Sequence, residues 1–343
     1  HAMITFSPRA VSKDFLMHLP DRSRRVLSER FGLSPKGQER TLDAIGQDYG
    51  ITRERVRQIE SHGLSSIRES DAYETHAANL LALKQAIDAL GAAVAHEHAL
   101  AELAKSAADR QHLGFLFAVG HHFGTRREDS EFRERVYTDE RLMDAVERAL
   151  GDLYESIDDE HLSPEEEFLE MFAALLRAYE VKNKEPQVLS RWLIISKRIG
   201  KNPLGEWGRA DSPHVRIRNT RDFAYLTLKR HGSPMHFTEV ATGIDKLFRR
   251  KTHPATTHNE LIKDNRFVLV GRGLYALKEW GYEPGIVRDV IRNILEREGG
   301  ALTREEIAER VKRERYVKEA TIGVNLQHAM CTRLPDDRFA LAK

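Results

Sequence analysis

The segment between residues 52 and 58 concentrates polar side chains that can read base pairs in duplex DNA. The four base-reading candidates are Arg53, Glu54, Arg57 and Gln58. Arginine pairs with guanine O6 and N7, glutamine pairs with adenine, and glutamate accepts a hydrogen bond from cytosine N4. Thr52 and Arg55 are candidates for phosphate contacts. The segment therefore predicts a surface that enters the DNA major groove.

A helix over residues 53–68 would hold these side chains on one face. At 100° per residue the apolar residues fall on the other side, where they can pack. They are Val56, Ile59, Gly63 and Ile67. Thr52 is a good N-cap, and Gly50 makes a tight turn after a shorter helix over 41–49, preceded by a helix over 22–31. This order predicts a helix-turn-helix, although a charged amphipathic helix without a DNA role would show the same periodicity.

Several strings of residues within 20–69 resemble region four of the housekeeping bacterial sigma factors. They are residues 25–27, 30–33, 41–46 and 51–60. In that family the region binds the promoter's minus 35 element and packs on the flap of the RNA polymerase beta subunit. The resemblance implies that Arg53, Glu54, Arg57 and Gln58 read bases, with duplex DNA and RNA polymerase as partners.

The surroundings of this segment differ from those of a complete sigma factor. Fewer than about 25 residues precede it, so we expect no domains that recognise and melt the downstream promoter element. The family usually continues with basic residues after Ile67, whereas this chain continues Arg68-Glu69-Ser70-Asp71. We therefore expect weaker affinity for the DNA backbone at this end of the helix.

Charge is distributed unevenly along the chain. Residues 1–70 carry 12 basic and 9 acidic side chains, residues 71–180 carry 10 and 24, and residues 181–343 carry 32 and 20. Two basic blocks that flank an acidic one favour polyanion binding at the two ends. Solvated helix faces of different sign are the competing explanation.

The composition of the 343 residues narrows the class of protein. No apolar run is long enough to cross a bilayer and no signal-peptide pattern is present, so we expect a cytoplasmic, nucleoid-associated protein. Cys331, the single cysteine, excludes internal disulfides and is expected to be a small buried hydrophobe. His121 and His122 have no partners at metal-ligand spacing, and no nuclease, ATPase or nucleophile–base motif occurs. We expect no metal, no cofactor and no enzymatic activity.

The acidic block is expected to be helical. Residues 71–185 predict a helical spacer or a domain through which the chain forms a homodimer. Residues 186–218 contain Trp192 and Trp207 and predict a connector packed on the domain that follows. Stacking of these aromatic side chains on nucleic-acid bases is the alternative.

Residues 219–283 predict a winged helix. Three helical patterns precede two apolar strands, 267–270 and 274–277, that are joined by Gly271-Arg272-Gly273. These glycines fit a dinucleotide-binding fingerprint only superficially, because they lie between two strands, as in a hairpin tip.

Three strings in this domain resemble the HARE-type helix-turn-helix over residues 219–282. They are residues 235–240, 257–261 and 267–273. That family includes the delta subunit of RNA polymerase and modules of restriction enzymes and chromatin regulators, and the resemblance implies contact with DNA or the transcription machinery. The side chains expected to face DNA are Thr256, Thr257, His258 and Lys263, with Arg272 on the wing. Capping and packing are their alternative roles.

Residues 284–343 repeat the plan and predict a second winged helix. A basic cluster there could neutralise phosphates, although a solvated basic face would look the same. It comprises Lys312, Arg313, Arg315 and Lys318. The expected fold class is mainly α, with a helix-turn-helix over residues 1–70, a helical middle and two winged helices with small β-hairpins.

Three functions are consistent with these patterns. The leading hypothesis is a non-enzymatic transcription regulator that binds duplex DNA and contacts RNA polymerase. A factor that occupies the polymerase flap with little DNA affinity of its own is the second. The third is the DNA-targeting subunit of a restriction or defence system, which would need a separate nuclease.

Overall fold

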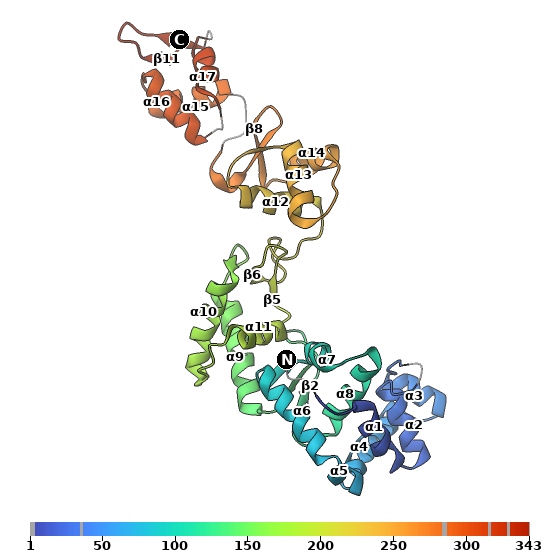
Figure 1. Cartoon of the computed structure of the whole chain (residues 1–343). Helices are drawn as coiled ribbons and strands as arrows, with labels where there is room; N and C mark the ends of the chain where they lie inside the picture. Colours follow the sequence, from blue (N-terminus) through green and yellow to red (C-terminus); the bar gives the residue numbers. More distant parts are fainter. Residues whose placement is uncertain (1–3, 35–36, 283–286, 315–316, 328–329, 343) are drawn as a thin grey trace. The chain divides into compact units, whose positions relative to one another are not determined.

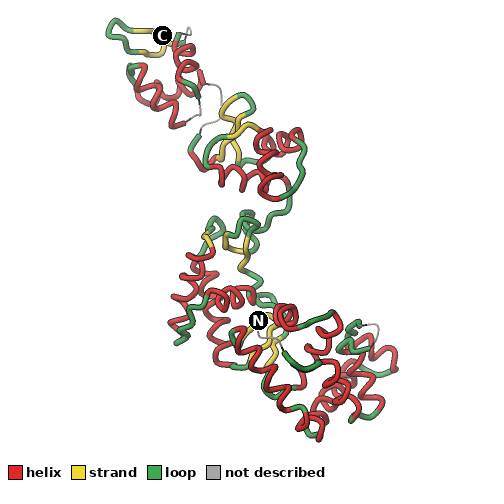
Figure 2. The backbone as a smooth tube through the Cα atoms, viewed as in Figure 1, coloured by secondary structure: helices red, strands yellow, loops and turns green. Residues whose placement is uncertain are grey.

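The computed structural model describes residues 4–34, 37–282, 287–314, 317–327 and 330–342. The chain divides into two compact units, His1–Val215 and Arg216–Lys343. Helices dominate both units (Figures 1 and 2), and the strands form small antiparallel sheets of two or three. The expected fold class, mainly α with small hairpins, is confirmed. None of the helices in the described ranges combines the length and apolar character that a membrane crossing requires.

The first five helices contain the expected helix-turn-helix. They are α1 (Pro8–Met17), α2 (Asp21–Arg30), α3 (Leu42–Tyr49), α4 (Arg53–Arg68) and α5 (Asp71–Thr75). The Thr41 and Thr52 hydroxyls accept hydrogen bonds from backbone N–H groups in the first turns of α3 and α4. Gly50 closes α3 with φ +64°, a conformation that glycine adopts without steric cost. Helix capping and one glycine therefore define the α3–α4 turn.

Residues 77–137, named repeat 1, combine three helices with a three-stranded sheet. The elements are α6 (Ala77–Leu90), β1 (Ala93–Ala95), α7 (His96–Leu103), α8 (Ala107–Val119), β2 (Gly124–Arg126) and β3 (Arg135–Tyr137). The sheet order is β1-β3-β2, and Val94 pairs with Val136 in the β1–β3 register.

Residues 140–209, named repeat 2, have the same order of elements. They are α9 (Glu140–Ser156), β4 (Ser163–Pro164), α10 (Glu165–Leu176), the 3-10 turn η1 (Arg177–Tyr179), α11 (Pro186–Ile195), β5 (Ile199–Lys201) and β6 (Glu206–Arg209). The sheet order is β4-β6-β5. Three acidic residues, Glu165, Glu166 and Glu167, occupy the first turn of α10, where the positive end of the helix dipole favours them.

The second unit contains two further copies. Repeat 3 (residues 220–277) comprises α12 (Thr220–His231), β7 (Met235–His236), α13 (Phe237–Phe248), α14 (Pro254–Lys263), β8 (Phe267–Gly271) and β9 (Leu274–Leu277), followed by η2 (Lys278–Trp280). Repeat 4 (residues 287–341) comprises α15 (Val287–Glu298), α16 (Arg304–Glu314), α17 (Glu319–Leu326), β10 (Cys331–Arg333) and β11 (Phe339–Leu341). An isolated bridge between Leu302 and Phe339 takes the place of the first strand.

The order helix, strand, helix, helix, strand, strand occurs in repeats 1 to 3, and repeat 4 has it with an isolated bridge in place of the first strand. Repeats 3 and 4 occupy the two ranges for which the sequence predicts winged helices, and that assignment stays a prediction. Residues 71–185 were expected to form a helical spacer or a dimerisation domain, and in repeats 1 and 2 short strands lie between the helices of this region. Strands of two to four residues are too short to show clearly the alternating pattern by which strands are recognised.

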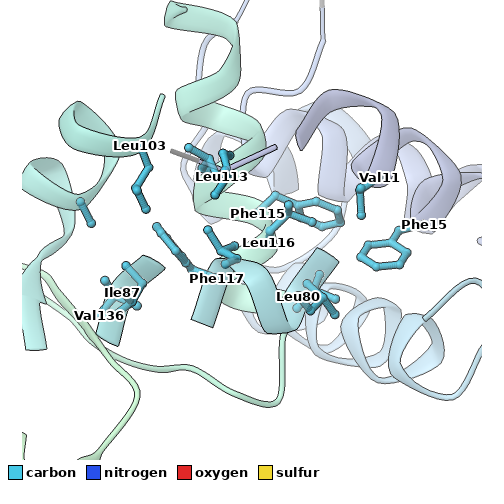
Figure 3. Close-up of a cluster of buried hydrophobic side chains, with 14 of the residues drawn as sticks. Val11, Phe15, Leu80, Ile87, Leu103, Leu113, Phe115, Leu116, Phe117 and Val136 are labelled. Atoms are coloured by element: carbon cyan, nitrogen blue, oxygen red, sulfur yellow. The ribbon is translucent and has the colours of Figure 1, made fainter. Parts of the chain in front are cut away.

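The apolar core of the N-terminal helices is continuous with that of repeat 1. One cluster contains Val11 and Phe15 of α1, Leu27 of α2 and Phe115 of α8. Figure 3 shows side chains from both parts gathered in this cluster. The cluster thus contains residues from both sides of the domain boundary that was expected after residue 70.

Repeat 2 has its own core, which includes both tryptophans of the expected connector. Trp192 and Trp207 are buried in a cluster with apolar residues of α9 and α10. The Trp192 indole donates a hydrogen bond to the Gly91 carbonyl in repeat 1, at 3.1 Å. The apolar faces of this segment are therefore buried against the helices that precede it, and its packing on the following domain stays a prediction.

Candidate nucleic-acid interface

Helix α4 has one packed face and one exposed face. Val56 and Ile59 lie in a small core with residues of α2 and α3, and Ile67 lies in the cluster shared with repeat 1. Gly63 lies so close to α2 that an added Cβ atom would be 3.0 Å from a Leu27 methyl carbon. The opposite face is accessible to solvent along its length, as the amphipathic pattern predicted.

All six predicted DNA contacts on α4 and its cap are exposed. They are Thr52, Arg53, Glu54, Arg55, Arg57 and Gln58. The Arg57 side chain donates two hydrogen bonds to the Glu54 carboxylate, at 2.7 and 2.9 Å, and it lowers the pKa of that carboxyl below its ordinary value. Arg55 donates to the Gln58 side-chain oxygen at 3.0 Å. Because these pairs are exposed, DNA groups can replace them at little cost.

Arg53 has a different partner, which the sequence did not indicate. Its guanidinium lies 3.7 Å from the Asp43 carboxylate of α3. Both side chains are more than half exposed, so this is a surface ion pair. Asp43, Gly46 and Thr52 line a shallow cleft at the α3–α4 turn, next to the reading face.

A polar network around Glu29 holds α3 against α2. The Glu29 carboxylate accepts from Arg40 at 2.6 Å and from the Tyr49 hydroxyl at 3.0 Å. Arg40 also lies 2.6 Å from Asp48. Burial, together with the hydrogen bond to Glu29, raises the pKa of Tyr49. The network fixes the helix that precedes α4 and therefore the angle at which α4 is presented.

The other side of the helix-turn-helix is covered by α8 of repeat 1. The rings of Phe31 and Phe115 meet edge to face, with centroids 5.3 Å apart. Arg68, at the end of α4, donates to the carbonyls of Ala118 and Val119 at 2.7 and 2.8 Å. The basic residue at this end of α4 therefore contacts protein backbone.

The N-terminal segment is a helix-turn-helix whose second helix, α4, has an exposed polar face, and it is similar to a known protein family. Residues 15–69 match the model of the family Sigma-70, region 4. Over 55 residues the chain is 42% identical to the RNA polymerase principal sigma factor HrdD of Streptomyces griseus. The match spans 16% of this chain and 16% of that protein. No solved structure matches the chain.

These matches confirm the resemblance to sigma region four for this segment alone. The HARE-type resemblance of residues 219–282 stays a prediction.

In repeat 3 the predicted DNA contacts divide into exposed and packed residues. Thr256, Lys263 and Arg272 are exposed. Thr257 is fully buried, and its hydroxyl donates to the His253 carbonyl at 3.4 Å. His258 is half-buried and stacks on Phe237, with ring centroids 4.3 Å apart. Because Thr257 is buried and its hydroxyl bonds to the backbone at the start of α14, the structure favours the packing role for this residue.

In repeat 4 two residues of the predicted basic cluster form surface ion pairs. Lys312 lies 3.0 Å from Glu319, and Arg313 pairs with Glu309. Lys318 is the residue before α17, and Arg315 lies outside the described residues. Two of the four cations therefore have an acidic neighbour, as a solvated face would also show.

Metal and thiol chemistry have little structural support. In the described part of the chain, no three His, Cys, Asp or Glu side chains are grouped as a metal site would require. Cys331 is half-buried against the core of repeat 4, and burial raises the pKa of its thiol. A raised pKa disfavours the reactive thiolate.

Proposed function

We propose that this protein is a DNA-binding transcription regulator that reads a promoter-like element through α4. The observation that carries the proposal is the exposed row of polar side chains on α4, in a segment that matches Sigma-70 region 4. Arg57 and Gln58 lie in the first two turns, the part of a recognition helix that enters the major groove. The protein acts without catalysis or cofactor, on nucleoid DNA in the cytoplasm.

Contact with RNA polymerase is the second part of the proposal, and it rests on the same family match. The alternative is a polymerase-binding factor with little DNA affinity. One observation bears on the choice. Among the described residues of the matched segment 15–69, Met17 is the one exposed large hydrophobic side chain, whereas Phe31 and Leu64 pack into the cluster shared with repeat 1. Apart from Met17, a protein partner of this segment would have to use its polar surface or displace α8, which favours the DNA-reading role.

Additional phosphate contacts are proposed for the second unit. The exposed candidates in repeat 3 are Thr256, Lys263 and Arg272. A homodimer through the acidic block has no support in the structure. Within the described residues of 71–185, Leu81 is the one exposed large hydrophobic side chain. A dimer interface usually needs a larger apolar surface.

Footprinting on the DNA regions that the protein occupies in cells tests the proposal. Wild-type protein should protect a promoter-like element, and Arg57→Ala or Gln58→Ala should weaken binding roughly tenfold, since one good pair to a base discriminates by about this factor. Arg141→Ala is a matched control, because Arg141 is an exposed arginine on α9, outside the helix-turn-helix. Equal footprints for wild type and both α4 variants would refute DNA reading by α4. Polymerase pull-down without any DNA shift would select the alternative.

A further inference from the structure

The four repeats differ in what covers their third helix, the element that usually faces DNA in a winged helix. In repeat 1 the third helix is α8, whose Leu113, Phe115 and Leu116 are buried in the cluster shared with the N-terminal helices. In repeat 2 the third helix is α11, and its Val188 packs tightly against Gly91. A Cβ atom added at Gly91 would lie 2.7 Å from a Val188 methyl carbon. Both helices are extensively packed, and their fully exposed residues are confined to the first turn: Ala107 and Ala108 in α8, and Pro186 and Gln187 in α11.

The third helix of repeat 3, α14, is accessible. Thr257 and Leu261 point inward and are buried. Thr256, Asn259 and Lys263 are exposed on the other side. A threonine and an asparagine can contact base edges, and a lysine can contact a phosphate. The exposed surface of α14, which also includes Ile262, thus carries three polar side chains suited to DNA contact.

The turn before α14 carries three consecutive exposed cations, Arg249, Arg250 and Lys251. Arg249 ends α13 with φ +52°, in the left-handed region. The corresponding position after α3 is Gly50, with φ +64°. Glycine is the default residue at such a helix end because a side chain is strained there. Arg249 therefore places a charge at a position where glycine would be the unstrained residue.

The charge of the surrounding domain supports the same interpretation. Residues 216–282 carry 13 basic and 6 acidic side chains. Of the acids, Asp222 and Asp264 are paired with Arg266 inside the domain. Asp245 lies in the cleft between α13 and α14, together with Lys251 and His253. The excess of cations complements a polyanion.

We propose that the α13–α14 turn and the exposed side of α14 form a second site for duplex DNA. Arg249 and Lys251 neutralise phosphates, while Thr256 and Asn259 face the groove. The inference rests on the proposed function, from which duplex DNA is taken as the ligand. It does not require that α4 reads bases. Under this proposal, repeats 1 and 2 build the first unit, and at least repeat 3 binds DNA.

The test uses the full chain with α4 disabled by Arg57→Ala and Gln58→Ala. Binding of a fluorescent duplex of random sequence is measured by anisotropy over roughly 50–200 mM salt. The additional pair Arg249→Gln and Lys251→Gln should weaken binding at least fivefold and reduce the slope of log K against log salt by about 2, since each phosphate contact contributes about 0.9. The pair Arg230→Gln and Lys278→Gln is the control, because it removes the same charge from exposed positions of this domain outside the turn.

Arg249→Gly separates binding from folding. Glycine relieves the strain at φ +52°, so the melting temperature should rise while affinity for the duplex falls. The proposal is overturned if the two charge pairs weaken binding equally, or if Arg249→Gly binds as tightly as its parent. The binding of the charge-pair variants and of Arg249→Gly is measured with α4 disabled. The result therefore does not depend on whether α4 reads bases.

Discussion

Arg68 in α4 donates a hydrogen bond to the carbonyl of Val119, at the end of α8, at 2.8 Å. This contact joins the end of the reading helix to repeat 1 across 51 residues of sequence. Arg68→Ala should lower the free energy of unfolding of the first unit by about 1–2 kcal/mol, because two partly buried carbonyls lose a charged donor. Urea unfolding of wild type and variant measures the difference. An unchanged unfolding curve would mean that the contact does not hold the two parts together.

The α3–α4 turn depends on the lack of a side chain at Gly46. A Cβ atom there would lie 2.7 Å from the Ile51 carbonyl oxygen. Gly46→Ala should therefore push the two helices apart, with a loss of about 1–3 kcal/mol in stability and weaker DNA binding. Thermal unfolding and a gel-shift assay measure the two effects.

Gly151→Ala is the control for Gly46. Gly151 lies inside α9, and an added Cβ atom there would have no neighbour within 4 Å. This substitution should stabilise the protein by about 0.5–1 kcal/mol, because alanine is the better helix former. If both alanine variants behaved alike, the close approach at Gly46 would not explain the turn.

His112 in α8 should make the stability of the first unit depend on pH. Burial, and after it the charge of Arg9, lowers the pKa of His112 below its ordinary value of 6.5. The unfolded chain therefore takes up the proton first, so stability is complete above about pH 6.5 and falls as the pH drops towards the folded pKa. Urea unfolding at about pH 7.5 and pH 5.5 measures the change.

His112→Leu removes the titrating group from the same buried position. The variant should lose less stability than wild type between the two pH values. Equal losses would show that His112 does not cause the pH dependence.

In the second unit, Asp264 should stabilise repeat 3 at neutral pH. Burial opposes its ionisation, but hydrogen bonds from the Arg266 side chain and backbone outweigh burial and lower the pKa of Asp264 below its ordinary value of 3.8. Its contribution is thus present above pH 3.8 and is lost as the pH falls through the folded pKa. Asp264→Asn should cost about 2 kcal/mol at neutral pH. Hydrogen exchange of the backbone amides in α12 and β8 shows whether the stability is lost in repeat 3. If these amides were as well protected in Asp264→Asn as in wild type, Asp264 would not stabilise this repeat.

The helix-turn-helix could be predicted from the sequence because its signals are local. Thr52 and Gly50 mark the helix ends within a few residues, and the spacing of Val56 and Ile59 defines the packed face. The packed position of Thr257 had a local signal as well. It lies four residues before the buried Leu261, and residues at this spacing share one helix face.

Repeats 1 and 2 could not be predicted in the same way. The strand β4 consists of Ser163 and Pro164 alone. Two residues cannot show an alternating pattern, and proline is not typical of a strand interior. The covering of the helix-turn-helix by α8 depends on contacts such as Phe31 with Phe115, which are far apart in sequence. A contact between residues so far apart in the chain leaves no periodic pattern in a single sequence, so it could not be predicted.

The most direct test of the account is a measurement of base preference by α4. Binding is measured for a set of duplexes in which each base pair of the footprinted element is replaced in turn, with wild type, Arg57→Ala and Arg141→Ala. We expect wild type and Arg141→Ala to show the same preferences, whereas Arg57→Ala should lose discrimination at one or two adjacent positions and retain its affinity for random DNA. Identical preferences for wild type and Arg57→Ala, or no preference in wild type, would contradict it.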